Sequence, residues 1–117
     1  MITEIAFFVY PVSDMARARA FYEGILGLKL ENNWQDLWVE YDVHGVALAI
    51  TSADMGQTPG AKGGVVGLEV DDFGAEIQRL KAQQVCFVME VFATPVCRMA
   101  VIADPDGNHI TIHKRNA

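Results

Sequence analysis

Apolar and polar residues alternate along most of this chain, and two segments follow a helical period instead. The alternating segments are rich in β-branched and aromatic residues, which is typical of strands. They cover residues 4–12, 28–35, 37–43, 46–52, 64–72, 85–92, 96–104 and 108–114. Residues 13–27 and 72–84 space their apolar side chains three and four apart and begin with Ser or Asp. Each of these two segments therefore predicts a capped helix.

The order strand, helix, strand, strand, strand occurs twice along the chain. The segment "YDVHGVALAIT" at 41–51 matches "ADPDGNHITIH" at 103–113, and the turn glycines Gly45 and Gly107 coincide. We interpret this match as an internal repeat of one βαβββ unit. A right-handed crossover then makes the first and fourth strands of each repeat parallel neighbours.

The chain has 117 residues, about half of them apolar, which predicts one compact α+β domain over residues 1–117. Repeat one spans 1–51, a Gly- and Pro-containing linker spans 52–63, and repeat two spans 64–117. The net charge of −6 without a basic cluster argues against nucleic acid and anionic membranes as partners. We find no signal peptide and no apolar run of about 20 residues, and expect a cytoplasmic protein. Cys86 and Cys97 are expected to be reduced core residues.

Strand alternation also predicts which side chains face away from the helices. Val46, Leu48 and Ile50 should face the helix of repeat one, so their neighbours point to the opposite face. We expect this bare face, in both repeats together, to carry Phe7, Val9, Trp38, Glu40, Ala49, Val65, Glu69, Thr111 and His113. Such a partly apolar face must pack against the sheet of the other repeat, against another subunit or against a ligand.

Two motifs resemble the vicinal oxygen chelate superfamily, which includes glyoxalase I, extradiol dioxygenases, and fosfomycin and bleomycin resistance proteins. They are "VSDMARARAFYEGILGLKL" at 12–30 and "DPDGNHITIH" at 104–113. The resemblance implies a curved open mixed β-sheet built from the two βαβββ repeats. We expect a homodimer, since twofold pairing is the commonest assembly, and the linker would permit swapping of repeats. The family's fold hosts lyases, isomerases, oxygenases, transferases and binding proteins, so the fold alone does not assign a function.

In the metal-using members of that superfamily, four ligands come from the first and last strands of each repeat and are usually His, Gln or Glu. The resemblance places those positions at Phe7, Ala49, Val65 and Thr111. The first three have no donor atom, and a threonine hydroxyl is a poor ligand for a divalent ion. A shift of one residue would bring in only apolar side chains. We therefore expect neither a metal nor another cofactor.

Other polar residues on the bare face leave alternatives open. His109 and His113 share a face but lie about 13 Å apart along a strand, too far to share one ion. His113 and Glu69 fall on neighbouring strands, where a hydrogen-bonded or ionic pair is simpler than a metal site. Glu40 and Glu69 are either groups that bind a cation or act as a base, or rim residues that reach solvent or pair with Arg98 or Lys114.

The run that includes Asp104, Asp106 and Asn108 has the look of a small metal loop. It lacks the remaining ligands of a calcium loop. We therefore interpret these three as turn residues that bond to their own backbone.

These residues favour a metal-independent small-molecule binding protein that resembles the bleomycin resistance proteins. Trp38 should face the cavity if the hairpin pairs it with Ala49, and Trp34 could do the same. Aromatic rings stack on flat ligands and acidic side chains attract cations, so we expect an aromatic ligand, with or without a positive charge. The alternatives are a glyoxalase-type lyase or isomerase that uses Glu69, His113 or His109, a relative of the metal-dependent dioxygenases, or a dimer whose bare faces cover each other.

Overall fold

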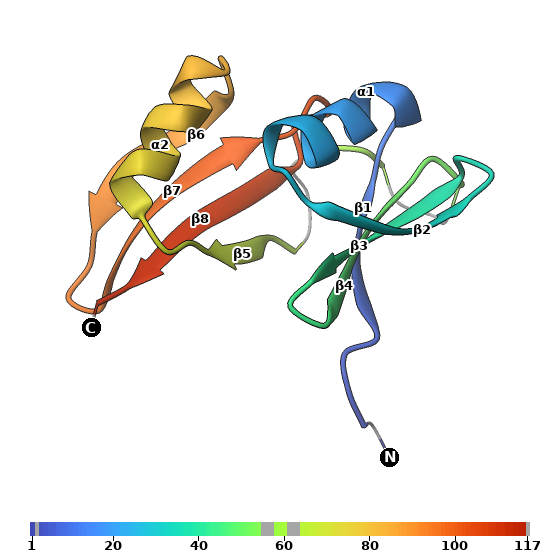
Figure 1. Ribbon diagram of the computed structural model, residues 1–117, viewed down its shortest axis with the longest axis horizontal. Coiled ribbons are helices and arrows are strands. Elements are labelled where there is room, and N and C mark those ends of the chain that lie inside the picture. The colour runs from blue at the N-terminus through green and yellow to red at the C-terminus, as the bar shows by residue number, and fades with distance from the viewer. Residues whose placement is uncertain (2, 55–57, 61–63, 117) are drawn as a thin grey trace. The chain divides into compact units, whose positions relative to one another are not determined.

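The chain folds into two compact units, residues 1–60 and 61–117, and each unit is one βαβββ repeat. The computed structural model describes residues 1, 3–54, 58–60 and 64–116. The predicted repeat is confirmed (Figure 1). Of the predicted linker 52–63, residues 55–57 and 61–63 lie outside the described residues.

The first unit is a four-stranded sheet with a helix on one face (Figure 1). Its order is β1-β4-β3-β2, with β1 parallel to β4 and the other pairs antiparallel, as the crossover rule requires. The elements are β1 (Phe7–Pro11), α1 (Met15–Arg19), β2 (Lys29–Trp34), β3 (Trp38–Val43) and β4 (Val46–Thr51).

The helix of the first unit begins and ends where its sequence predicts. The Asp14 carboxylate accepts a hydrogen bond from the Arg17 amide at 3.0 Å, which caps the first turn. Helix α1 continues as a π-helical turn over Ala20–Ile25, and Gly27 follows with φ at +70°. The sheet residues that alternate with the bare face are buried beneath this helix: Val39, Tyr41, Leu48 and Ile50.

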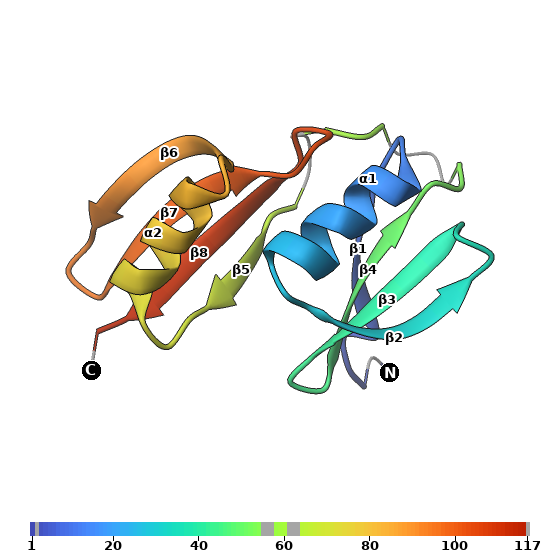
Figure 2. The same ribbon diagram turned by 45° about the horizontal axis from the view of Figure 1, so that its top comes forward.

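The second unit repeats this arrangement in the order β5-β8-β7-β6, with β5 parallel to β8 (Figure 2). Its elements are β5 (Val66–Glu69), α2 (Phe73–Ala82), β6 (Cys86–Ala93), β7 (Cys97–Ala103) and β8 (His109–Arg115). The Asp72 carboxylate caps α2 by accepting from the Ala75 amide at 3.1 Å. The core between α2 and the sheet contains Ile77, Leu80, Ala100, Ile102, Ile110 and Ile112.

The hairpin that joins β3 to β4 has a different register from the one predicted. Trp38 pairs with Thr51, and Glu40 is the residue that pairs with Ala49. The cause is the turn, because His44 and Gly45 both have positive φ and form the two central residues of a tight loop. The shift is two residues, so every side chain keeps the face that alternation assigns to it.

One core prediction is wrong. Cys97 is buried, but Cys86 is exposed at the start of β6, the edge strand of the second sheet. An edge strand has a neighbour on only one side, so fewer of its side chains are covered. Both cysteines are free thiols. Among the described residues, no helix has the length and apolar composition needed to cross a bilayer.

Candidate functional site

An aromatic pair lies on the bare face of the first unit. The rings of Phe7 and Trp38 meet edge to face with centroids 5.1 Å apart. Trp34 pairs directly with Trp38 across β2 and β3, so it lies on the same face, and about half of its surface is exposed. The register thus brings Phe7, Trp34 and Trp38 onto one side of the sheet, the side opposite α1.

Glu40 is joined to this aromatic pair by a direct hydrogen bond. The Nε1–H of Trp38 donates to Oε2 of Glu40 at 2.9 Å. This bond fixes the indole, and the carboxylate keeps a second oxygen for other partners. Ala49 lies opposite Glu40 and has no exposed surface, and Val9, its neighbour on β1, is partly buried. A molecule bound here would therefore contact Phe7 and Trp38 rather than Ala49.

A small cavity of about 70 Å³ lies beside Glu40. Its lining contains three acidic residues together with small and aromatic ones: Glu31, Glu40, Tyr41, Asp42, Gly45 and Ala47. Glu31 reaches it from the irregular part of β2, where the pairing with β3 shifts between Leu30 and Asn32. The cavity thus places further acidic side chains beside Glu40, the residue that is bonded to Trp38.

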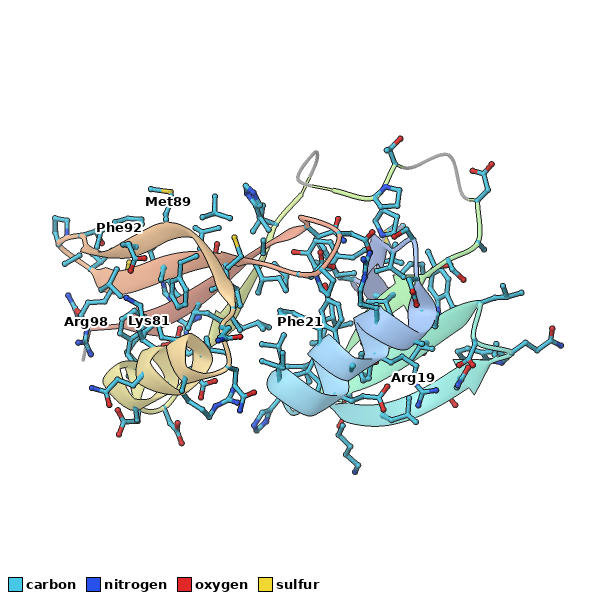
Figure 3. The ribbon with its side chains drawn as sticks, turned by 90° about the horizontal axis from the view of Figure 1, so that it is seen from above. Arg19, Phe21, Lys81, Met89, Phe92 and Arg98 are labelled. Carbon is cyan, nitrogen blue, oxygen red and sulfur yellow. The ribbon has the colours of Figure 1, made fainter. Side chains whose placement is uncertain are left out.

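In the second unit, a histidine and a glutamate of the bare face form a pair. Nδ1 of His113 lies 2.6 Å from Oε1 of Glu69, and the Arg115 amide donates to Oε2 of Glu69 at 2.8 Å. The Arg115 amide and then His113 hold the pKa of the Glu69 carboxyl below its usual value. Arg98, an alternative partner predicted for Glu69, lies instead over the Phe73 ring at 4.9 Å, on the α2 side of the sheet (Figure 3).

The four positions that the family resemblance assigns to metal ligands do not fit a divalent ion. Phe7 and Ala49 offer no donor atom. Val65 precedes β5 and is exposed, and the β5 residue opposite Thr111 is Gly67. Among the described residues, no three His, Cys, Asp or Glu side chains are grouped so that they could hold an ion. The hydroxyl of Thr111 is the only side-chain donor at these positions.

The turn before β8 is built by its own side chains. Oδ1 of Asp104 accepts hydrogen bonds from the amides of Asp106 at 2.9 Å and Asn108 at 2.8 Å. Its Oδ2 accepts from the Asn108 side chain at 2.7 Å. The interpretation of this run as turn residues is therefore confirmed. His109 follows at the start of β8, where it pairs with Ala103.

Sequence reasoning missed a polar network on the helical side of the first unit. Glu23 accepts from the Arg19 side chain at 2.7 Å and from the Tyr41 hydroxyl at 2.8 Å. Arg19, which projects from α1 in Figure 3, also donates to Asp36 at 3.1 Å. Arg19 and then Tyr41 hold the pKa of the Glu23 carboxyl below its usual value, although burial opposes them. The four-residue spacing of Arg19 and Glu23 was the available signal.

Known proteins match the chain over nearly its whole length. A family model described as Glyoxalase/Bleomycin resistance protein/Dioxygenase superfamily matches residues 4–112. Among solved structures, TnmS3, an antibiotic binding protein from Streptomyces sp. CB03234, is 28% identical, with 98% of each chain covered and a TM-score of 0.85. A glyoxalase/bleomycin resistance protein from the same organism is 30% identical over 93% of this chain and 98% of that chain, with a TM-score of 0.77.

An enzyme with lower sequence identity has a similar fold. The lactoylglutathione lyase from Agrobacterium tumefaciens is 19% identical, with 97% of this chain and 95% of that chain covered and a TM-score of 0.78. A similarity at this level of identity concerns the fold. No curated protein matches the chain.

Proposed function

The chain belongs to the Glyoxalase/Bleomycin resistance protein/Dioxygenase superfamily, and we propose that within it this protein binds an aromatic small molecule without a metal ion. The observation that supports this best is the pairing of Phe7 with Trp38 on the bare face, with the indole held by Glu40. Rings fixed in this way offer a rigid surface on which a flat molecule can stack at little entropic cost.

The acidic cavity beside Glu40 supports a ligand with a positive charge. Glu31, Glu40 and Asp42 line it, and a cation near Trp38 would also be attracted by the face of the indole. The similarity to TnmS3, whose structure is described as that of an antibiotic binding protein, agrees with a binding role for this chain. Carbon side chains at three of the four metal-ligand positions agree with binding that needs no chelate.

The experiment uses the two tryptophans of the chain, Trp34 and Trp38, as separate reporters. Purified protein, treated with a chelator and then freed of it, is titrated with a panel of flat aromatic cations while fluorescence is recorded. The Trp34→Phe variant, which keeps Trp38, should bind with the affinity of the wild type. The Trp38→Ala variant should bind about tenfold more weakly, because stacking on one aromatic ring contributes on the order of 1 kcal/mol beyond area burial.

Two results would count against the function. Affinity that is unchanged in Trp38→Ala would place the ligand elsewhere. Binding that is lost after chelation and restored by a divalent ion would show that the ligand needs a metal.

The homodimer stays a prediction and is part of the proposal. Its support is the apolar surface that edge strand β6 leaves exposed, with Val88, Met89 and Val91 each 43–50% accessible. Figure 3 shows Met89 on the side of β6 away from α2. Light scattering at several protein concentrations tests it, and a mass of one chain at every concentration would reject it.

A further inference from the structure

The pair formed by His113 and Glu69 leaves one nitrogen of the imidazole available. A carboxylate only accepts hydrogen bonds, so the 2.6 Å contact requires the hydrogen to be on Nδ1. When the ring is neutral, Nε2 carries a lone pair. Glu69 itself cannot turn away easily, since its second oxygen accepts from the Arg115 amide at 2.8 Å.

Around this pair, two neighbouring rows of side chains on the bare face of the second sheet differ in height above the sheet. Glu69, His113 and Met99 lie side by side in one row across β5, β8 and β7. The next row consists of Gly67, Thr111 and Val101. The second row is lower beside His113 because Gly67 has no side chain and Thr111 has a short one.

The space above Gly67 is open. No atom of a described residue, apart from its own chain neighbours, lies within 4 Å of the position that a Cβ atom would take on Gly67. Glycine weakens a strand interior, and its presence often marks a place where another group approaches the backbone closely. About a quarter of the His113 side chain and a third of the Glu69 side chain remain exposed, so both can be reached.

We propose that His113, oriented by Glu69, accepts a hydrogen bond from the hydroxyl group of a phenolic ligand whose ring lies over Gly67. The open row accommodates a flat ring, and the partly exposed Met99 beside His113 can contact its edge through sulfur. A lone pair on Nε2 selects a ligand that donates, and a hydroxyl on the ring is such a donor. This site is built from residues of the second unit alone, and its assignment goes beyond the function proposed for Phe7 and Trp38.

The test compares 2-naphthol with 2-methoxynaphthalene, which has nearly the same shape but no hydrogen to donate. By calorimetric titration, the wild-type protein should bind 2-naphthol about fivefold more tightly, the typical net value of one hydrogen bond. In His113→Phe the preference should disappear while the affinity for the methyl ether is kept. The matched control is His109→Phe, four residues away on the same strand and face, which should keep the preference.

Two further variants separate positioning from binding. Gly67→Leu should weaken the binding of both naphthalenes at least fivefold, because its side chain fills the open row. In Glu69→Gln the amide can donate to Nδ1, so the imidazole can shift its hydrogen to Nε2. Nitrogen-15 NMR of the free protein should show hydrogen on Nδ1 in the wild type and a mixture in Glu69→Gln, with at least a twofold smaller preference for 2-naphthol.

The outcomes test this assignment separately from the function proposed for Phe7 and Trp38. If neither naphthalene binds, the assignment fails, while the function at Phe7 and Trp38 is decided by the titration with aromatic cations. If both bind equally well, or if His113→Phe keeps the preference, the assignment is overturned. Hydrogen on Nε2 in the free wild-type protein would overturn it as well.

Discussion

The hydroxyl of Tyr41 donates a 2.8 Å hydrogen bond to Oε2 of Glu23, which connects the middle of β3 to the π-helical turn above it. The same carboxylate accepts two hydrogen bonds from Arg19, at 2.7 and 3.2 Å. Tyr41 has no exposed surface, and its ring stacks on that of Tyr22. The helix of the first unit is thus attached to its sheet by a charge-assisted bond as well as by apolar packing.

Replacing Tyr41 with Phe should destabilise the protein by about 1–2 kcal/mol, because a hydrogen bond to a charged group is lost while the ring stays in place. Urea denaturation followed by circular dichroism measures the change. Glu90→Gln is the control, since it breaks only the exposed pair with Lys81 and should change stability by less than about 0.5 kcal/mol. Equal effects of the two changes would mean that the Tyr41 hydroxyl contributes nothing beyond a surface contact.

The pH dependence of stability should contain a contribution from Glu23. Its pKa is lower in the folded chain than in the unfolded chain, because Arg19 and Tyr41 bond to the charged form. The stabilisation is therefore present above the unfolded pKa of about 4.3 and is lost as the pH falls through the folded value. The difference in unfolding free energy between the wild type and Glu23→Gln should shrink from pH 7 to pH 3. A constant difference over this range would contradict the assignment.

Alternation and helical period were sufficient to predict the order of the strands and helices and the faces of β3 and β4, since these depend on local spacing. The Trp38–Thr51 pairing was not predicted, because it depends on which two residues adopt positive φ in the turn. The contact of Glu69 with His113 followed from parallel neighbours and parity, both visible in the sequence. The Glu23–Tyr41 hydrogen bond could not be predicted. It joins residues 18 positions apart and depends on how the helix packs on the sheet, which no local pattern encodes.

The two copies of the turn before the last strand should differ in stability contribution. Asp104 accepts from two amides and from Asn108, and both of these side chains are buried. In the other repeat, Asp42 accepts from the Gly45 amide, and within the part of the chain that the structure describes this is its one such bond. We expect Asp104→Ala to cost about 2–4 kcal/mol and Asp42→Ala about 1 kcal/mol, because only the first leaves buried donors unsatisfied. Thermal unfolding of the two variants measures both losses of stability. Similar losses would show that burial of the Asp104 turn is unimportant.

Glu40→Gln isolates the contribution of charge to the proposed binding site. Glutamine can still accept the hydrogen bond from the Trp38 indole, so the ring should stay in place while one negative charge beside the acidic cavity is removed. Affinity for phenyltrimethylammonium should fall about two- to fivefold, whereas affinity for tert-butylbenzene, its neutral analogue of the same shape, should not change.

Glu90→Gln makes the same change in net charge on an exposed part of β6, and it should change the affinity for neither ligand. Competition titrations at low and high salt measure the affinities of the wild type and both variants for the two ligands, and the effect of Glu40→Gln should be smaller at high salt because ions screen the carboxylate. If the neutral ligand loses as much affinity as the cation, Glu40 acts by holding Trp38, and the preference for a positive charge has to be abandoned.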